Sequence, residues 1–439
     1  IFAAVNTDAG AVTIESADNL TINAAGLTAK GAIVIEAGND ITLGAGDGIA
    51  INTNTSTALV KLQADNDGAG DGAIVDGGSL IAMTGGDLVL RAKTGIGTNG
   101  AKIETTGLVD FAAISTTGGI FLDNGTSGAI NITTLDGVTG ISTATSGNIG
   151  IINSAAANIK VSSAIDANRV GGTVTLNAGA ALDIDAAITA AGAIDLDAAT
   201  NFDIDATITG GGNVELDTTG GTVDVAAASR VIGGGDGTTL AINASGAITF
   251  NAGGDATETV TNTGSGAITV ISSGAGITLK NDAVSIADGV LTLTADGAIA
   301  VDSNATQQID SDGNVIISAN GITGTGGLDI NSDAPGADRA LTITSTGSTG
   351  MAVNVVADLY SSITIVQQDA STSINVELVG DDTIDIDGTA DTVTLKSVVT
   401  SAADIGFDYD LTEALKNRIV ESVNTDAGAG RVEYANSMN

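Results

Sequence analysis

The sequence predicts an all-β fold, a single-stranded parallel β-helix with about 20 residues per coil. Three observations support this prediction. Pairs of aliphatic residues separated by one residue recur at intervals of about 20 residues over the most regular stretch of the pattern. Glycine, with 61 residues among 439, gathers with Asn and Asp between these pairs, where the chain must turn. Aromatic residues make up only 2% of the chain, which indicates a core too narrow for bulky rings.

The period is clearest between residues 173 and 225. Val174, Ile194 and Val214 are evenly spaced, and Leu182 and Phe202 are separated by the same interval. Alternation over three to five residues is typical of a short strand with one buried face. Two or three strands in a repeat of this length are too tightly spaced for hairpins with antiparallel returns. Each strand is therefore expected to pair with the equivalent strand one coil away, and the inward side chains stack into aliphatic ladders.

Residues 1–400 are expected to form one β-helical rod. The apolar pairs are regular over residues 12–51 and 341–395 and weaker at 52–86 and 96–170, where we expect wider turns or small insertions. The alternative is an array of β-sandwich domains with a strand about every 8–12 residues. Such domains have larger cores, usually with an aromatic anchor, and do not need a fixed register from one repeat to the next. The pattern therefore favours the β-helix.

The best repeats share a template in which Gly is followed by a Val/Ile-x-Leu pair, a second pair and a single Ile. The two copies are Gly172–Ile188 and Gly192–Ile208. This template resembles the repeats of filamentous-haemagglutinin-like exoproteins, which are large secreted bacterial β-helical adhesins. The resemblance covers most of residues 10–400 at the level of pattern. The Asn-Pro secretion motifs of that family are absent, because Pro335 is the only proline.

Charge and composition restrict the partners. The chain has 14 basic and 52 acidic residues, a formal net charge of −38, so we expect no binding to nucleic acid or anionic membrane surfaces. Cys is absent, which excludes disulfides and thiolate metal sites. No apolar run approaches the length that spans a bilayer, so membrane insertion is not expected. The start at Ile1, without a signal-peptide pattern, suggests a mature or excised segment. This composition suits an extracellular or cell-surface prokaryotic protein.

Acidic residues occupy the outward positions of the best repeats. With this coil length, Asp183 and Asp185 lie one rung from Asp203 and Asp205. A second column holds Asp195, Asp197, Glu215 and Asp217. Carboxylates stacked about 5 Å apart repel each other, and bridging Ca²⁺ ions would relieve that repulsion. The other interpretation is a solvated acidic face that keeps an edge-rich rod soluble. Both interpretations remain open, and Asp183, Asp185, Asp203 and Asp205 are the candidate calcium ligands.

Residues 401–439 are expected to form a C-terminal cap or assembly segment with a short helix. Asp410-Leu-Thr-Glu413 fits a capping box, and Leu411, Leu415, Ile419 and Val423 fall on one face of a helix. Such a helix would cover the open core of the last coil, as solenoids require. Alternatively, it would dock on a neighbouring subunit.

A repeated hexapeptide favours assembly. Asn6–Ala11, NTDAGA, recurs as Asn424–Ala429, and Val precedes both copies. In so biased a composition the recurrence can arise by chance; otherwise the chain is one unit of a longer tandem array, or its tail imitates the coil that begins the next subunit. Both give head-to-tail contacts, which generate filaments when the rotation does not close a ring. The candidate assembly residues are Asn6, Asp8, Leu411, Leu415, Ile419, Asn424 and Asp426, and the partner is a second copy of the chain.

Catalysis is not expected. His and Cys are both absent, so a His-dependent triad, a thiol nucleophile and an ordinary zinc site are excluded. We therefore expect a non-enzymatic structural protein, a β-solenoid that assembles head to tail into a filament, sheath or surface layer. The first alternative is the stalk of a secreted adhesin with a host or cell-surface ligand. The second is a β-helix enzyme that acts on polysaccharides, although Trp, the usual sugar platform, is absent.

Overall fold

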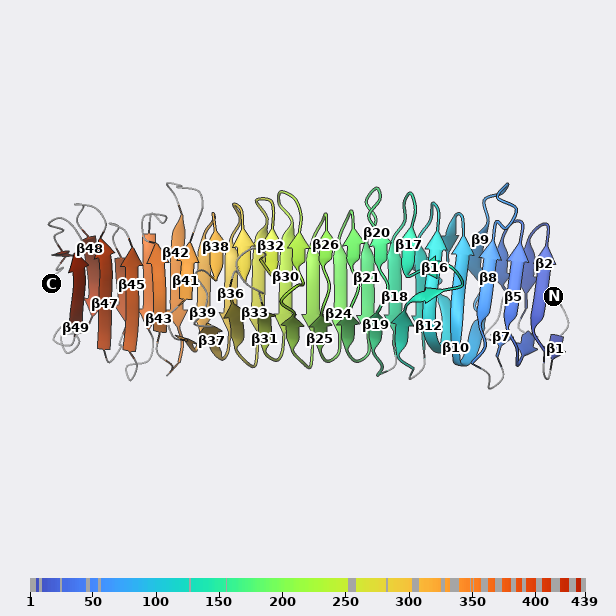
Figure 1. Ribbon diagram of the computed structural model, residues 1–439, viewed down its shortest axis with the longest axis horizontal. Coiled ribbons are helices and arrows are strands. Elements are labelled where there is room, and N and C mark those ends of the chain that lie inside the picture. Colours follow the sequence, from blue (N-terminus) through green and yellow to red (C-terminus); the bar gives the residue numbers. More distant parts are fainter. Residues whose placement is uncertain are drawn as a thin grey trace. The chain divides into compact units, whose positions relative to one another are not determined.

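The computed structural model describes most of residues 5–349. The gaps are 8–9, 24–25, 45–47, 54–56, 126–127, 155, 252–257, 282, 302–307, 325–327, 332–338 and 348. From residue 351 onward the backbone of strands β43–β50 is described (Figure 1). Every element in these described parts is a β-strand. The chain divides into two compact units, Ile1–Gly220 and Gly221–Asn439.

The strands of the first unit have these bounds: β1 Val5–Thr7, β2 Val12–Ser16, β3 Leu20–Ile22, β4 Leu27–Ala29, β5 Ile33–Ala37, β6 Ile41–Leu43, β7 Ile49–Asn52, β8 Val60–Ala64, β9 Ala73–Asp76, β10 Leu80–Ala92, β11 Gly95–Ile96, β12 Ile103–Ser115, β13 Ile120–Asn124, β14 Ile130–Ile132, β15 Thr134–Leu135, β16 Val138–Thr139, β17 Ile141–Thr143, β18 Ile149–Asn153, β19 Ile159–Val161, β20 Ile165–Ala167, β21 Val174–Ala178, β22 Leu182–Ile184, β23 Ile188–Ala190, β24 Ile194–Ala198, β25 Phe202–Ile204, β26 Ile208–Gly210 and β27 Val214–Thr218.

The strands of the second unit have these bounds: β28 Val223–Val225, β29 Val231–Gly233, β30 Thr239–Ala244, β31 Ile248–Asn251, β32 Val260–Asn262, β33 Ala267–Ser272, β34 Ile277–Lys280, β35 Val284–Ile286, β36 Leu291–Ala295, β37 Ala298–Val301, β38 Ile309–Ser311, β39 Val315–Ala319, β40 Gly321–Thr323, β41 Leu328–Asn331, β42 Ala340–Ser345, β43 Met351–Val356, β44 Ser362–Gln367, β45 Ser373–Val379, β46 Ile384–Gly388, β47 Thr392–Val399, β48 Ile405–Leu411, β49 Ile419–Thr425 and β50 Val432–Ala435.

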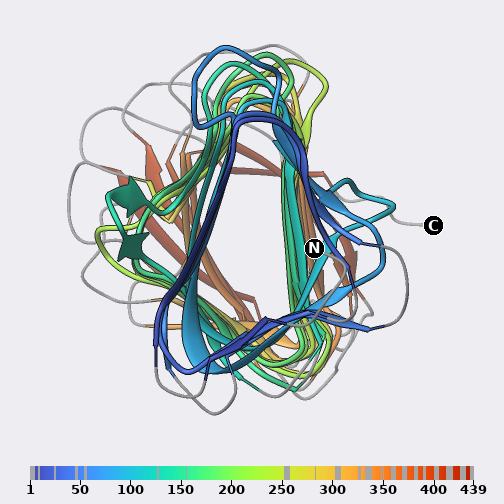
Figure 2. The same ribbon diagram turned by 90° about the vertical axis from the view of Figure 1, so that its right-hand side faces the viewer.

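Each unit is a parallel β-solenoid. In the first unit, β21 pairs with β24 and β24 with β27, while β22 pairs with β25 and β23 with β26, all in parallel. In the second unit, β30, β33, β36, β39 and β42 follow one another in the same way. Strands of successive turns overlap as the sides of one coil in the end-on view (Figure 2). The predicted fold class is therefore confirmed.

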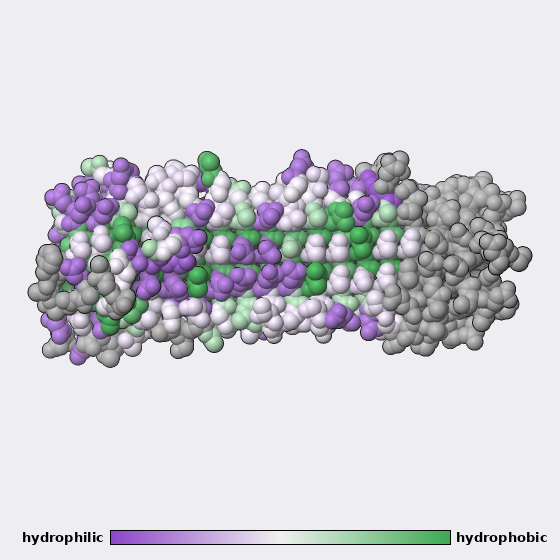
Figure 3. All heavy atoms as spheres, turned by 180° about the vertical axis from the view of Figure 1, so that it is seen from behind, coloured by the Kyte–Doolittle hydropathy of each residue, from purple (hydrophilic) through white to green (hydrophobic). Residues whose placement is uncertain are grey.

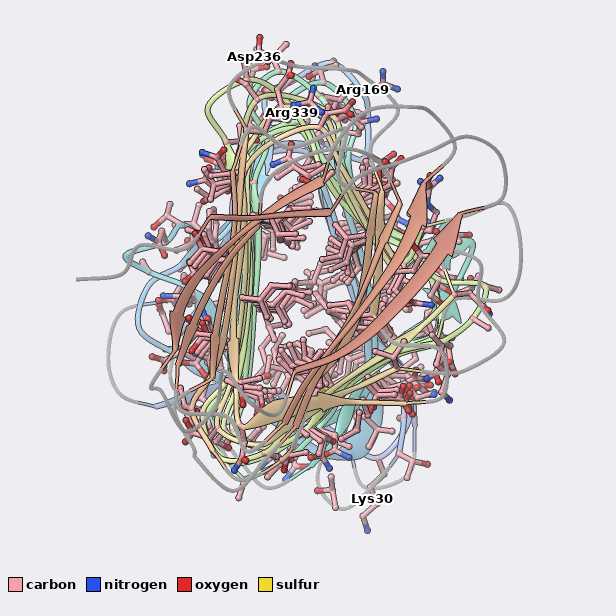
Figure 4. The ribbon with its side chains drawn as sticks, turned by 90° about the vertical axis from the view of Figure 1, so that its left-hand side faces the viewer. Lys30, Arg169, Asp236 and Arg339 are labelled. Carbon is pink, nitrogen blue, oxygen red and sulfur yellow. The ribbon has the colours of Figure 1, made fainter. Side chains whose placement is uncertain are left out.

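The core lies inside the coil and is made of aliphatic ladders. Leu182 and Ile184 lie in register with Phe202 and Ile204, and all four side chains are buried. Carbon-rich side chains fill the interior in Figure 4, whereas the labelled Lys30, Arg169 and Asp236 lie on the outside. This arrangement follows from the period-2 alternation, because every second side chain of a strand points to the same face.

The coil length differs from the predicted value over much of the chain. The register offset is 20 from Val174 to Ile194, but it is 27 from Ile33 to Val60 and 29 from Val231 to Val260. On average a turn takes about 24 residues. Most strands stay three to six residues long, so the additional residues lie largely in the turns, where insertions leave the ladders intact.

The strand pairing changes around β12, which pairs with three different strands along its length. Residues 103–105 of this strand pair with β13, residues 110–111 with β14 and residues 113–115 with β17. The strand bends at Gly107, whose φ is +65°. A single long strand thus faces three strands of the next coil. This is where the sequence predicts irregular turns and insertions.

The predicted C-terminal helix is not confirmed. Leu411 is the last residue of β48, and Ile419 and Val423 both lie in β49, so these positions are extended. Leu415 lies outside the described residues. β48 pairs in parallel with β46, and β49 with β47, so these segments continue the strand ladder. Ile419 and Val423 are four residues apart, a spacing that puts two side chains on one face of a strand as well as on one face of a helix.

Candidate functional site

The four candidate calcium ligands lie on the outside of neighbouring coils, as predicted. Asp183 and Asp203 are register partners in β22 and β25. Asp185 and Asp205 follow the next register pair, Ile184 and Ile204. The predicted register therefore places these carboxylates on adjacent rungs. The sequence analysis did not predict that a lysine, Lys160, pairs with two of these carboxylates.

Lys160 in β19 lies on the other side of Asp183, as its register partner. Its Nζ is 2.6 Å from Asp183 Oδ2 and 2.5 Å from Asp185 Oδ2. Hydrogen bonds from this ammonium lower the pKa of Asp185, and hydrogen bonds to both carboxylates raise the pKa of Lys160. Sequence reasoning missed this residue because the offset from Lys160 to Asp183 is 23, not 20.

The second acidic column also has the predicted register. Asp195 pairs with Glu215, and Asp197 with Asp217, across β24 and β27. Burial raises the pKa of Asp195, and the charge of Asp217 adds to the rise. The pKa of Asp197 and of Glu215 is raised for the same reasons, burial first and neighbouring carboxylates second. Asn177 Nδ2 donates a hydrogen bond to Asp197 Oδ2 at 3.2 Å. Figure 3 shows hydrophilic side chains gathered in two adjacent rows on the face that it draws.

The raised pKa values in this column predict that lowering the pH stabilises the coils that contain β24 and β27. A carboxyl whose pKa is raised by folding binds protons more readily in the folded state. Stability then falls as pH rises from the usual Asp range near 4 through the raised pKa. Asp195→Asn should therefore stabilise these strands by ~1 kcal/mol at pH 7.5 and low salt, with a smaller gain at pH 4.5. Amide hydrogen exchange in β24 and β27 at the two pH values, corrected for intrinsic exchange rates, measures this gain in stability.

The matched control is Asp18→Asn, which replaces an exposed carboxylate in a turn of the same unit. It should leave exchange in β24 and β27 unchanged at both pH values. Equal protection in the wild-type chain and Asp195→Asn at pH 7.5 would show that repulsion in the column does not weaken the fold.

The candidate assembly residues are placed in part. Asn6 lies in β1, which pairs with β4, and Asn424 lies in β49. Asp8 and Asp426 lie outside the described residues. Both copies of the Val-Asn-Thr sequence are strand residues, since Val5–Thr7 is β1 and residues 423–425 end β49. The next strand begins at Val12 after the first copy and at Val432 after the second.

An outer hairpin, β15–β16, is a feature that the sequence analysis did not identify. It is the antiparallel pair among the described strands, with Leu135 opposite Val138. Asp136 and Gly137 form its two-residue loop with φ values of 44° and 72°, as a type I′ turn requires. Leu135 and Val138 pack on the outside of the coil against a cluster that also contains Leu59, Val89, Ala112 and Ile114.

Charged groups fix this hairpin to the coil. Arg91 Nη2 donates a hydrogen bond to the carbonyl oxygen of Asp136 at 2.7 Å, and Lys61 Nζ lies 3.4 Å from Asp136 Oδ2. Lys61 also pairs with Glu36 at 3.2 Å. The hairpin therefore covers a small apolar area on the outer surface of the coil.

No group of three or more His, Cys, Asp or Glu side chains suited to a metal ion is found in the described part of the chain. Within the same residues, no helix is long and apolar enough to cross a membrane. Comparisons with protein-family models, curated proteins and solved structures find no match to this chain.

Proposed function

We propose that this protein is a non-enzymatic extracellular structural protein whose coils stack head to tail into a filament, sheath or surface layer. The observation that carries the proposal is the recurrence of Val-Asn-Thr as strand residues in β1 and at the end of β49. Because a β-solenoid grows by adding like coils in parallel, a second copy of the chain can continue the ladder.

The edge of β2 provides the contact. Among the described strands β2 pairs only with β5, and Val12 N–H bonds to Ala32 O at 2.8 Å. Alternate residues of a strand bond to opposite neighbours, so the N–H and C=O of Thr13 and Glu15 point to the other edge. Such an edge is a template for another strand. The net charge of −38 opposes association between copies, so cations or salt would be needed to screen it.

Calcium is part of this proposal. An ion that bridges Asp183, Asp185, Asp203 and Asp205 would have to compete with the Lys160 ammonium for Asp183 and Asp185. Carboxylate oxygens are the ligands that Ca²⁺ prefers. A melting temperature that rises with calcium and falls again with EDTA supports this role, and one that EDTA leaves unchanged removes it.

The experiment that tests assembly compares Thr13→Pro with Thr13→Val. Proline removes the outward N–H without removing a bond to β5, while valine keeps the N–H. We expect the wild-type chain and Thr13→Val to polymerise in sedimentation velocity runs as concentration and calcium rise. Thr13→Pro should require at least tenfold more protein. A wild-type chain that stays monomeric throughout would contradict the proposal.

The second candidate function is the stalk of a secreted adhesin, as the resemblance to filamentous-haemagglutinin-like repeats implies. The outer hairpin favours it, because a loop on the outer surface of a solenoid is a natural place for a ligand. Electron microscopy separates the two candidates. An ordered polymer of identical units supports assembly, and isolated particles that bind cell surfaces through the hairpin support the stalk.

A further inference from the structure

One face of the second unit carries no charge. It is formed by β30, β33, β36, β39 and β42, which pair in register. We call it the neutral face. Its outward positions form three columns: Thr239, Ala267, Val290, Asn314 and Ala340, of which Val290 and Asn314 directly precede β36 and β39; Ala241, Thr269, Thr292, Ile316 and Thr342; and Asn243, Ile271, Thr294, Ser318 and Thr344. None of these fifteen residues is ionisable, in a chain with 66 charged residues, 14 basic and 52 acidic.

The strand register beyond β42 shows where the outward positions become charged again. The next strand in the ladder, β44, places Ser362, Thr364 and Val366 in the same columns. One coil further, β46 places Asp385 and Asp387 there. The uncharged composition of this face therefore ends at β46, and the rows of near-neutral and apolar side chains in Figure 3 agree with its Thr and Ile content.

A second observation concerns exposed apolar side chains. Val290 and Ile316 are 37% and 43% exposed, and they are the large exposed hydrophobic residues of the second unit within its described part. Both lie on the neutral face, in adjacent coils. They add apolar area to a face whose remaining outward residues are small or uncharged, a composition that lowers the cost of covering it.

We propose that the neutral face pairs with the same face of a second copy of the chain. Charge selects this occupant. Two copies that each carry −38 repel through their acidic faces, whereas two neutral faces bring no carboxylates together. Two flat sheets pack face to face about 10 Å apart, with Thr methyl groups and the Val290 and Ile316 side chains interdigitating. The contact is lateral, so it is independent of the head-to-tail stacking proposed above.

The size of the neutral face makes this contact weak. Five strands about 4.8 Å apart and about five residues wide, at about 3.3 Å per residue, cover roughly 400 Å² on each copy. A stable complex buries about 800 Å² per partner. A single pair is therefore expected to dissociate readily, and many such contacts along a polymer would add up. Lateral pairing would turn single filaments into bundles or layers.

Cysteine cross-linking tests the pairing, because the chain has no cysteine of its own. Thr292 lies in the middle column of the middle strand, near the two-fold axis that a self-complementary contact requires. Under mild oxidation, Thr292→Cys is expected to form disulfide-linked dimers at least tenfold faster than the control Val170→Cys. Val170 is 89% exposed and lies in the first unit. Higher salt should increase the difference, because it screens the remaining repulsion.

Two further variants complete the test. Adding Ile316→Glu or Thr294→Glu to Thr292→Cys places a charge on an outward position and should lower cross-linking to the Val170→Cys rate. Below the concentration at which the wild-type chain polymerises, adding Thr13→Pro should leave cross-linking unchanged, which separates a failure of lateral pairing from a failure of stacking. Equal rates for Thr292→Cys and Val170→Cys would overturn the proposal, as would cross-linking that Ile316→Glu and Thr294→Glu do not reduce.

Discussion

Phe202→Ala is expected to destabilise the coils around β25 by about 3–5 kcal/mol, the usual cost of removing a buried phenyl ring. Phe202 is 1% exposed and lies in register with Leu182 inside the coil. The interior is narrow and lined by aliphatic ladders, so few neighbouring side chains can move to fill the space. The loss should be local, because each coil contacts only its neighbours. Hydrogen exchange of the amides in β22 and β25 measures it.

The control for this substitution is Val170→Ala, at a side chain that is 89% exposed. It should change the opening free energy by less than about 0.5 kcal/mol. Protection in β2 and β5, many coils away, should be the same in both variants. A loss below about 1 kcal/mol in Phe202→Ala would show that Phe202 does not fill the core.

Gly107→Ala is expected to cost at least about 3 kcal/mol, because two effects act together. The φ of Gly107 is +65°, which L-residues with a side chain rarely adopt. A Cβ at this position would also meet the backbone oxygen of Met83 at 2.1 Å. This glycine lets β12 bend and change partners without leaving the ladder. Urea unfolding monitored by circular dichroism should show an early transition of the first unit.

Gly100→Ala provides the matched control. No atom lies within 4 Å of a Cβ built on Gly100, and its φ is not positive. The substitution should be neutral within about 0.5 kcal/mol. If Gly107→Ala and Gly100→Ala unfold at the same urea concentration, the bend at Gly107 is not a constraint on the fold.

The sequence predicted the solenoid because its signal is repeated many times. Pairs such as Val174 with Leu176 are informative only together, since a single short strand is ambiguous. The predicted register also placed Asp183 beside Asp203 and Asp195 beside Glu215 correctly. The predicted register failed where the turns between strands make a coil longer than 20 residues. Lys160 was missed for this reason, because the coil that begins with it is longer than the repeat period.

Two local signals were interpreted wrongly or not used. Leu135-Asp136-Gly137-Val138 is a strong hairpin sequence, because an Asp-Gly loop between apolar residues fits a type I′ turn. The C-terminal apolar spacing at Leu411, Ile419 and Val423 predicts a helix, yet these residues lie in strands. Spacing in a short segment does not distinguish the two structures when the neighbouring coils offer strands for pairing. Tertiary pairing decides such cases.

Cryo-electron microscopy of the concentrated wild-type chain in calcium and moderate salt tests the central claim most directly. If parallel coils stack from one copy to the next, the images should show filaments whose power spectrum has a reflection at about 4.8 Å along the filament axis. Monomeric particles at every concentration, or filaments with this spacing of about 4.8 Å perpendicular to the axis, would contradict the account.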